Sequence, residues 1–147
     1  MHIDVRTEIE APTELVFDYL ADLANNPQWQ SGVAETSWKS PPPVAVGSTC
    51  EQRFDDGKVV GYRVLSIDPG KSMTIETLPG ASVPATIIRT VEKLGVSRSR
   101  VRMDLDGRVR GWRFVLTPLV KRLITRGIAA DYRRLKKLLE PDDQPGD

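Results

Sequence analysis

The side chains that most often carry catalysis are scarce in this chain. Its single histidine, His2, is the second residue, and its single cysteine, Cys50, has no histidine nearby in the sequence. No metal-ligand spacing and no glycine-rich phosphate-binding loop is present in the sequence. Any reaction would depend on groups such as Glu35, Tyr62 and Arg89, which can polarise an enol or a carbonyl. We therefore assign no catalytic residue and expect neither a metal nor a cofactor.

Three polar residues are candidates for orienting a ligand inside the protein. Glu35, Gln52 and Arg89 stand in predicted strands whose alternation is irregular, so each side chain could point inward. The alternative is that they are solvated, as such side chains usually are. Tyr62 stands opposite Arg63 in the alternation of VVGYRVL and is predicted to be buried, where a backbone hydrogen bond is the ordinary use of its hydroxyl.

Trp29 lies in a polar, turn-forming segment, ANNPQWQSGV, at residues 24–33. A tryptophan has a large apolar ring and an indole N–H that needs an acceptor, so this ring must be covered. The cover is either the protein core or a ligand, because ligand pockets are lined chiefly by apolar and aromatic groups. The sequence leaves both alternatives open.

The elements that must position these residues begin with a strand and a helix. HIDVRTEIE alternates between apolar and polar residues, which predicts a half-buried strand over 3–9. In APTELVFDYLADLAN the apolar residues recur at helical spacing, and Pro12 suits a first helical turn. That helix ends near Asn25 and Asn26, and a short helix or turn is expected over 27–30.

Turn signals then recur about every ten residues and predict a meander of further strands. Two of the runs alternate cleanly, with Val101, Met103 and Leu105 on one side of the first and with Met73 and Ile75 on one side of the second. One face of the sheet is therefore buried and the other is solvated. The predicted strands lie at 33–38, 48–54, 58–67, 72–78, 83–92 and 99–105.

The last segment is predicted to form a long helix. Thr117 and Pro118 fit a cap and a first helical residue, which gives a helix of about 22 residues that ends before Pro141. Alternatively, the helix begins near Gly111 and kinks at Pro118. It is the only predicted element long enough to lie across the sheet. Apolar residues near one face are Leu116, Leu119, Val120, Leu123, Ile128, Leu135 and Leu138.

Charge is uneven along the chain. Residues 108–140 carry ten Lys and Arg against two Asp and Glu, whereas the formal net charge of the whole chain is +1. The basic helix could contact anionic lipid headgroups transiently or bind a nucleic acid, but charged helix faces are usually solvated. Because the net charge is near zero, we expect no nucleic acid partner.

The expected compartment is the cytoplasm. Asp4, Arg6 and Glu8 leave no apolar signal-peptide core at the start of the sequence, and no stretch approaches a membrane span. The lone Cys50 excludes an internal disulfide and fits a reducing compartment.

Several segments together are similar to one known superfamily. TEIEAPTELVFDYLADLANNPQWQSGV, VGSTCEQRF, YRVLSIDPGKSMTIET and PLVKRLITRGIAADYRRLKKLLE resemble the START-like superfamily, also called SRPBCC or helix-grip. Within it, they resemble the bacterial group labelled polyketide cyclase/dehydrase and lipid transport. The resemblance implies an α+β fold in which a curved, seven-stranded antiparallel sheet wraps around a long C-terminal helix, in the order strand, two helices, six strands, helix. It also implies one domain over 1–140, followed by a polar tail over 141–147 that we expect to be disordered.

The resemblance further implies that a hydrophobic molecule, such as a lipid, a fatty acid or a polyketide-like compound, binds in a cavity under the long helix. Successive turns of a meander alternate between the two ends of a sheet, so Trp29 shares an end with the turns at 55–58 and 78–82 and with Trp112. We expect the mouth of the cavity there. The expected lining is Trp29, Phe54, Tyr62, Met73, Ile75, Met103, Leu116, Leu119, Val120 and Leu123, with Glu35, Gln52 and Arg89 as polar groups.

Three functions stay open at this point. The first is binding or transport of a small hydrophobic molecule, and the second is a cyclase or dehydratase acting on a polyketide-like substrate in the same cavity. The third is a protein-interaction module with a shallow cavity and no ligand. The protein could be a monomer or a dimer, because the open edge of the first strand permits pairing without requiring it.

Overall fold

The computed structural model describes residues 1–108 and 117–141. The polar tail over 142–147 and the alternative helix start near Gly111 lie outside the described residues. The elements follow one another in this order: β1 (His2–Ile9), α1 (Thr13–Ala21), the 3₁₀ turn η1 (Leu23–Asn25), α2 (Asn26–Trp29), β2 (Val33–Trp38), β3 (Thr49–Phe54), β4 (Val59–Asp68), β5 (Ser72–Thr77), β6 (Ala85–Gly95), β7 (Arg98–Gly107) and α3 (Thr117–Leu139).

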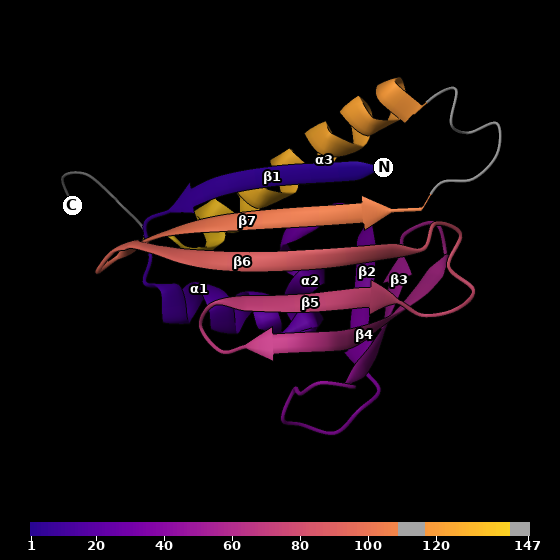
Figure 1. Cartoon of the computed structure of the whole chain (residues 1–147), viewed down its shortest axis with the longest axis horizontal. Helices are drawn as coiled ribbons and strands as arrows, with labels where there is room; N and C mark the ends of the chain where they lie inside the picture. Colours follow the sequence, from indigo (N-terminus) through magenta and orange to yellow (C-terminus); the bar gives the residue numbers. More distant parts are fainter. Residues whose placement is uncertain (109–116, 142–147) are drawn as a thin grey trace.

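The strands form one antiparallel sheet in the order β1-β7-β6-β5-β4-β3-β2 (Figure 1). Six of them follow each other as a meander, and β1 closes the sheet by pairing with β7, where Ile3 stands opposite Leu105 and Ile9 opposite Ser99. This arrangement confirms the predicted helix-grip fold. The predicted strands begin and end within about three residues of the observed ones, as expected for boundaries set by turn residues.

Two of the hairpin turns depend on glycine. Gly57 and Gly70 have φ values of +88° and +78°, a region that other L-residues rarely adopt. The turn signals DDGK and DPGK therefore place these bends because glycine alone enters that region without a steric penalty.

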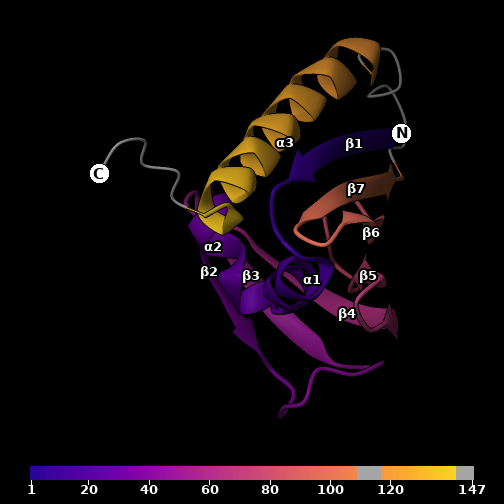
Figure 2. The ribbon, with the colours of Figure 1, turned by 90° about the vertical axis from the view of Figure 1, so that its left-hand side faces the viewer.

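The short helices fill part of the concave side of the sheet (Figure 2). The apolar stripe of α1 buries Val16, Phe17 and Leu20. Helix α2 follows η1 directly and buries Trp29. This helix is a single turn with Pro27 near its N-terminus, as the sequence predicts. The loop-like segment around Trp29 is thus folded into the interior.

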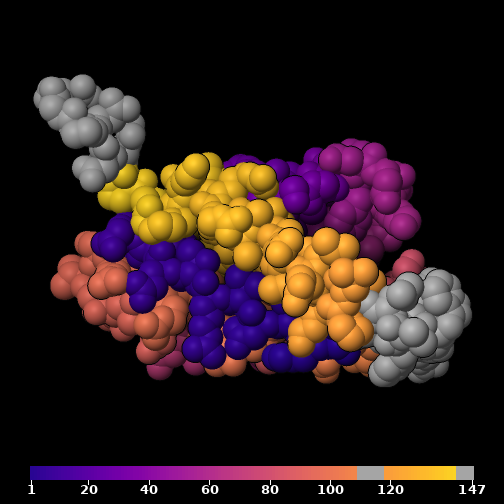
Figure 3. Space-filling model, turned by 90° about the horizontal axis from the view of Figure 1, so that it is seen from above, coloured from indigo at the N-terminus to yellow at the C-terminus, as the bar shows by residue number. Residues whose placement is uncertain are grey.

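Helix α3 is held by its C-terminal half. Tyr132 and Leu135 are buried against the rest of the core, whereas Leu119 and Leu123 are 61% and 60% exposed. Figure 2 shows why, because the first turns of α3 extend past β1 and the sheet, and Figure 3 shows these turns at the surface above β1. The expectation that the whole helix covers the sheet is therefore correct only for the second half. The described part of the chain includes no helix long and apolar enough to cross a membrane.

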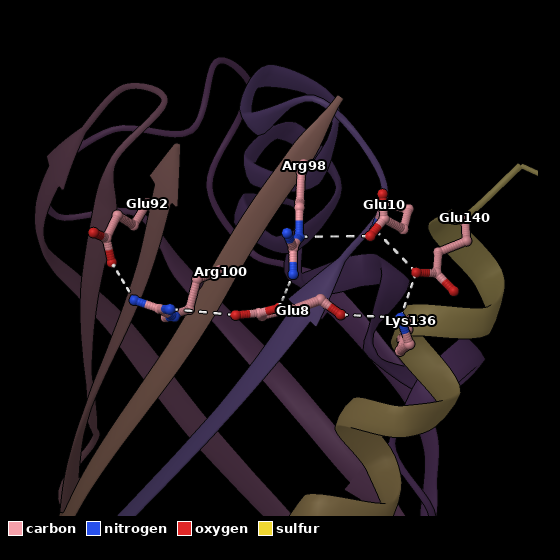
Figure 4. A network of polar contacts seen from close by, with 7 residues as sticks. All are labelled: Glu8, Glu10, Glu92, Arg98, Arg100, Lys136 and Glu140. Atoms are coloured by element: carbon pink, nitrogen blue, oxygen red, sulfur yellow. Dashed lines mark hydrogen bonds and ion pairs between the residues drawn. The ribbon is translucent and has the colours of Figure 1, made fainter. Parts of the chain in front are cut away.

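A polar network fastens the end of α3 to the edge of the sheet (Figure 4). Lys136 Nζ donates to the backbone carbonyl of Glu8 at 3.1 Å, and the Glu10 N–H donates to Glu140 Oε2 at 2.9 Å. Hydrogen bonds from Arg98 and then Arg100 lower the pKa of the Glu8 carboxyl. These contacts join β1, β7 and α3, so the helix has a fixed C-terminal end.

Candidate ligand-binding site

A small cavity lies between the sheet and helices α2 and α3. Its volume is about 240 Å³, and every strand from β2 to β7 contributes to its wall. The apolar part of the lining comes from alternate positions of the strands, because alternate side chains share a face of a sheet. The lining residues are Asn26, Trp29, Gln30, Ser31, Val33, Gln52, Phe54, Tyr62, Ile75, Ile87, Arg89, Met103, Leu105, Ile128, Asp131 and Tyr132.

A wider groove of about 780 Å³ adjoins this cavity. Four residues line both spaces, namely Phe54, Tyr62, Ile87 and Leu105. The groove is bounded by residues of the turns at 55–58 and 78–82 and by Val120 and Ile124 of α3. The prediction that these two turns share one end of the sheet is thus confirmed. Trp112 lies outside the described residues, and Trp29 lines the inner cavity rather than the groove.

Trp29 is both a core residue and a wall of the cavity. It is 1% exposed, and its ring meets the ring of Tyr132 edge-on with centroids 4.9 Å apart. Its backbone carbonyl accepts a hydrogen bond of 2.9 Å from Arg134 Nη1, which ties α2 to α3. The indole Nε1 has no hydrogen-bond partner among the described residues. The core therefore covers most of the ring, while contact with a ligand stays a prediction for the part that lines the cavity.

Arg89 is a buried cation at the same wall. It is 5% exposed, and its Nη1 donates to the Leu20 carbonyl at 3.1 Å. The guanidinium carbon lies 5.3 Å from the centre of the Trp29 ring, a distance at which the ring face attracts a cation. Its Nε has no partner among the described residues.

A second polar group joins helix α2 to the sheet. Gln52 Oε1 accepts hydrogen bonds from Asn26 Nδ2 at 2.9 Å and from Thr36 Oγ1 at 3.0 Å. All three residues are buried. Gln52 alternates with Cys50 and Phe54 along β3, which explains why it faces inward. Its hydrogen bonds make it a structural brace as well as part of the wall.

The buried hydroxyl and thiol groups near the cavity are weak acids that stay protonated at neutral pH. Burial raises the pKa of both Tyr62 and Tyr132, and the positive charge of Arg89 opposes the shift in each case. Burial likewise raises the pKa of the Cys50 thiol to about 11. None of the three groups is therefore suited to act as a base or nucleophile at pH 7.

The predicted site residues divide into three groups. Trp29, Phe54, Tyr62, Ile75, Met103, Gln52 and Arg89 line the cavity, and Val120 lines the groove. Met73 is buried in the core without lining either space, and Leu116 lies outside the described residues. Leu119, Leu123 and Glu35 are exposed at the surface and line neither the cavity nor the groove.

The departures have physical causes. Leu119 and Leu123 are exposed because the first half of α3 extends past β1, so they do not reach the cavity. Glu35 stands on the outer face of β2 and accepts a hydrogen bond of 3.1 Å from Arg53 Nη2. Hydrogen bonds from Arg53 and Ser37 lower the pKa of the Glu35 carboxyl, which is consistent with an ionised surface group. The expectation that Glu35 orients a ligand inside does not hold.

Several lining residues are not among those that the sequence pattern predicts for the cavity. Tyr132 stands four residues after Ile128 and three before Leu135, a helical stripe that could have revealed it. Ile87 was ambiguous because Ile88 follows it directly, so the sequence does not say which of the two faces inward. Asn26 carried no periodic signal, because it lies where η1 passes into α2.

The described residues contain no cluster of three or more His, Cys, Asp or Glu side chains positioned to hold a metal ion. The cavity instead offers apolar walls, two phenols, three amides, a serine hydroxyl, one carboxylate and one guanidinium group. Such a wall can enclose an apolar molecule and donate hydrogen bonds to it.

A comparison with family sequence profiles matches residues 1–140 to the family described as "Polyketide cyclase / dehydrase and lipid transport". The chain belongs to this family. The match confirms the resemblance inferred from the sequence. A search of the curated proteins found no match.

Solved structures of other proteins share the fold. A START superfamily protein from Mycobacterium smegmatis superposes with a TM-score of 0.77 at 16% identity, covering 94% of this chain and 96% of that one. The Zhui aromatase/cyclase from Streptomyces sp. R1128 gives a TM-score of 0.72 at 15% identity, with 95% and 93% covered. The di-domain ARO/CYC protein BexL, from the BE-7585A biosynthetic pathway, gives 0.76 at 15% identity. Its match covers 93% of this chain but only 45% of BexL.

Proposed function

We propose that this protein binds or carries a small hydrophobic molecule, such as a lipid, a fatty acid or a polyketide-like compound. The observation that carries the proposal is an apolar cavity that shares four wall residues with a wider groove at one end of the sheet. Membership of a family described by lipid transport and polyketide chemistry supports it. The groove would be the entrance, and movement of the 78–82 loop and the start of α3 would widen it.

The alternative of a cyclase or dehydratase receives less support from the residues at the wall. Such reactions need a group that takes up a proton at neutral pH. Tyr62 and Tyr132 have raised pKa values, and Asp131 Oδ1 already accepts a hydrogen bond from the Ser31 N–H at 3.1 Å. We therefore favour binding of a ligand over catalysis. We place the protein in the cytoplasm, a reducing compartment in which the lone cysteine stays reduced.

Filling the cavity tests the proposal. Ile87→Trp inserts a ring where the cavity and the groove meet, so the affinity for the neutral dye N-phenyl-1-naphthylamine should fall by about tenfold or more, as expected for loss of a well-packed apolar contact. Dye fluorescence measures the affinity. Ile88→Trp is the matched control, because Ile88 is 39% exposed and does not line either space. Native mass spectrometry of the freshly purified protein should show a co-purified small molecule.

Two results would refute this proposal. One is absence of dye binding and of any co-purified molecule in the unmodified protein. The other is equal loss of affinity in the two isoleucine variants, which would place the dye on the outer surface. Both variants should be checked for folding by circular dichroism, because overpacking can cost about 1–3 kcal/mol.

We further propose transient contact with an anionic membrane surface through the first half of α3. This half exposes apolar and basic side chains side by side, a combination that favours anionic lipid headgroups. The first turns of α3 project past the sheet in Figure 2 and lie at the molecular surface in Figure 3, so they are accessible. The apolar residues are Leu119, Val120, Leu123 and Ile124, and the basic residues are Lys121, Arg122 and Arg126.

Leu123→Asp should weaken binding to vesicles of phosphatidylcholine with about one quarter phosphatidylglycerol by about tenfold. The change removes apolar area that would be buried in the bilayer, and it adds a negative charge. Co-sedimentation at physiological salt measures the effect. Leu138→Asp is the control, since Leu138 is also about half exposed but stands at the fastened end of α3. If the unmodified protein does not sediment with these vesicles, or sediments equally with pure phosphatidylcholine, the membrane proposal fails.

A further inference from the structure

The wall of the cavity contains a positive charge with no negative partner. Arg89 is 5% exposed, and among the described residues it forms no ion pair. The carboxylate that lines the cavity, Asp131, accepts hydrogen bonds from the Ser31 N–H and from Arg134 instead. A buried charge is costly unless it is paired and hydrogen-bonded. Something is therefore needed to complete the surroundings of Arg89.

The contacts that Arg89 does make account for only part of its capacity. One Nη1–H bond goes to the Leu20 carbonyl, the Trp29 ring stands beside the guanidinium carbon, and the Arg89 side chain also hydrogen-bonds Tyr132. Guanidinium has five N–H donors and cannot lose its charge in a protein. The Nε–H donor is buried and unpartnered, and the indole N–H of Trp29 is a second buried donor without a partner. Two unsatisfied donors thus belong to neighbouring side chains at one wall.

The titratable neighbours do not neutralise this charge. Arg89 lowers the pKa of Tyr62, Tyr132 and Cys50, so its field reaches all three groups. Burial outweighs that effect, and all three stay protonated and neutral at pH 7. The protein itself therefore supplies no anion at this wall within its described residues.

We propose that the ligand carries an anionic oxygen group, in the manner of a monocarboxylate on an apolar body, which pairs with Arg89 inside the cavity. This inference rests on the proposed binding function and specifies the chemical class of the ligand. The Arg89 Nε–H and the Trp29 Nε1–H would donate to the anionic oxygens, and both orphan donors would then be satisfied.

The shape of the site fits such a molecule. The inner cavity of about 240 Å³ suits a head group with a short apolar portion, and the adjoining groove of about 780 Å³ can take a longer apolar body. Ile87 and Leu105 line both spaces, so an apolar chain could pass between them without meeting a charge. The polar end would therefore enter first and the apolar end would lie toward the groove.

A pair of nearly isosteric probes tests the inference. Displacement of N-phenyl-1-naphthylamine by 2-naphthoate should be at least about tenfold tighter than displacement by the neutral 2-naphthamide, because a charge-assisted hydrogen bond to a buried cation is strong. The measurement is made on the unmodified protein at physiological salt and neutral pH. In Arg89→Met, the preference for naphthoate over naphthamide should fall to within about twofold.

Two further variants separate a specific site from general attraction of anions. Arg63→Met removes an exposed arginine from the outer face of β4 and should leave the preference unchanged. Arg89→Lys keeps a charge and should retain part of the preference. If Arg89→Met does not fold, Arg89→Lys still tests the contribution of Arg89 to the preference for naphthoate.

The outcomes distinguish this inference from the function on which it rests. If both probes displace the dye equally from the unmodified protein, the ligand is not an anion and the inference fails, whereas the binding function stands. If Arg63→Met removes the preference as fully as Arg89→Met, the anion binds at the surface and the inference fails. If neither the dye nor either probe binds, the proposed function itself is overturned.

Discussion

Replacing Trp29 with alanine should lower the free energy of unfolding by about 3–5 kcal/mol, the usual cost of removing a buried tryptophan ring. The ring is 1% exposed and packs edge-on against Tyr132, so no solvent replaces it. The change also removes the aromatic face beside Arg89 and leaves that cation with less compensation. Urea unfolding followed by far-UV circular dichroism measures the loss.

Trp38→Ala provides the control for this prediction. Trp38 is only partly buried, and its Nε1 donates to Asp22 Oδ1 at 2.8 Å near the surface. Its removal should cost clearly less than that of Trp29. Equal costs for the two variants would mean that Trp29 is not an essential part of the core.

This result limits what Trp29 can reveal about binding. The sequence suggests that Trp29→Ala and Leu119→Trp would impair binding while the domain stays folded. The structure makes the first variant a test of stability and places Leu119 outside the cavity. Ile87 is therefore the better position for blocking the cavity, because it lines both the cavity and the groove.

Leu135→Ala should lower the free energy of unfolding by about 2–5 kcal/mol, the range for truncation of a buried leucine. Leu135 is fully buried at the centre of the half of α3 that packs against the core. The polar contacts of Lys136 and Glu140 are largely at the surface and cannot offset this loss. The same urea unfolding measurement applies.

Leu138→Ala is the matched control on the same helix. Leu138 is 49% exposed, so its truncation should change stability by less than about 1 kcal/mol. A similar cost for the two leucines would contradict the packing of α3 described here, because it would mean that both faces of the helix are equally covered.

The strands were predictable because their signals are local. In β7, apolar and charged residues alternate from Arg100 to Met103. This alternation indicates that Val101 and Met103 face the core. The turns were predictable for the same reason, since Gly57 and Gly70 mark conformations that other residues avoid. The curvature and the closing pair of β1 with β7 were available only through the family resemblance.

The candidate site was less predictable because its members meet only in three dimensions. In β6, apolar residues stand on both sides of the chain at Ile87 and Ile88, so the direction of Arg89 could not be derived from alternation. Tyr132 stands 103 positions from Trp29 in the sequence, yet the two rings are in contact. No local pattern reports a contact between residues so far apart.

The sequence by itself determined the order of the elements, the buried face of the clearest strands and the family, because hydrophobic period and turn chemistry act over a few residues. The tertiary structure decided that Trp29 belongs to the core and also lines the cavity. It also decided that only half of α3 packs on the sheet and that Arg89 is buried without a counter-charge among the described residues. These features depend on where β6, α2 and α3 meet. Their physical basis is the exclusion of water by packing between distant segments, which a local pattern does not encode.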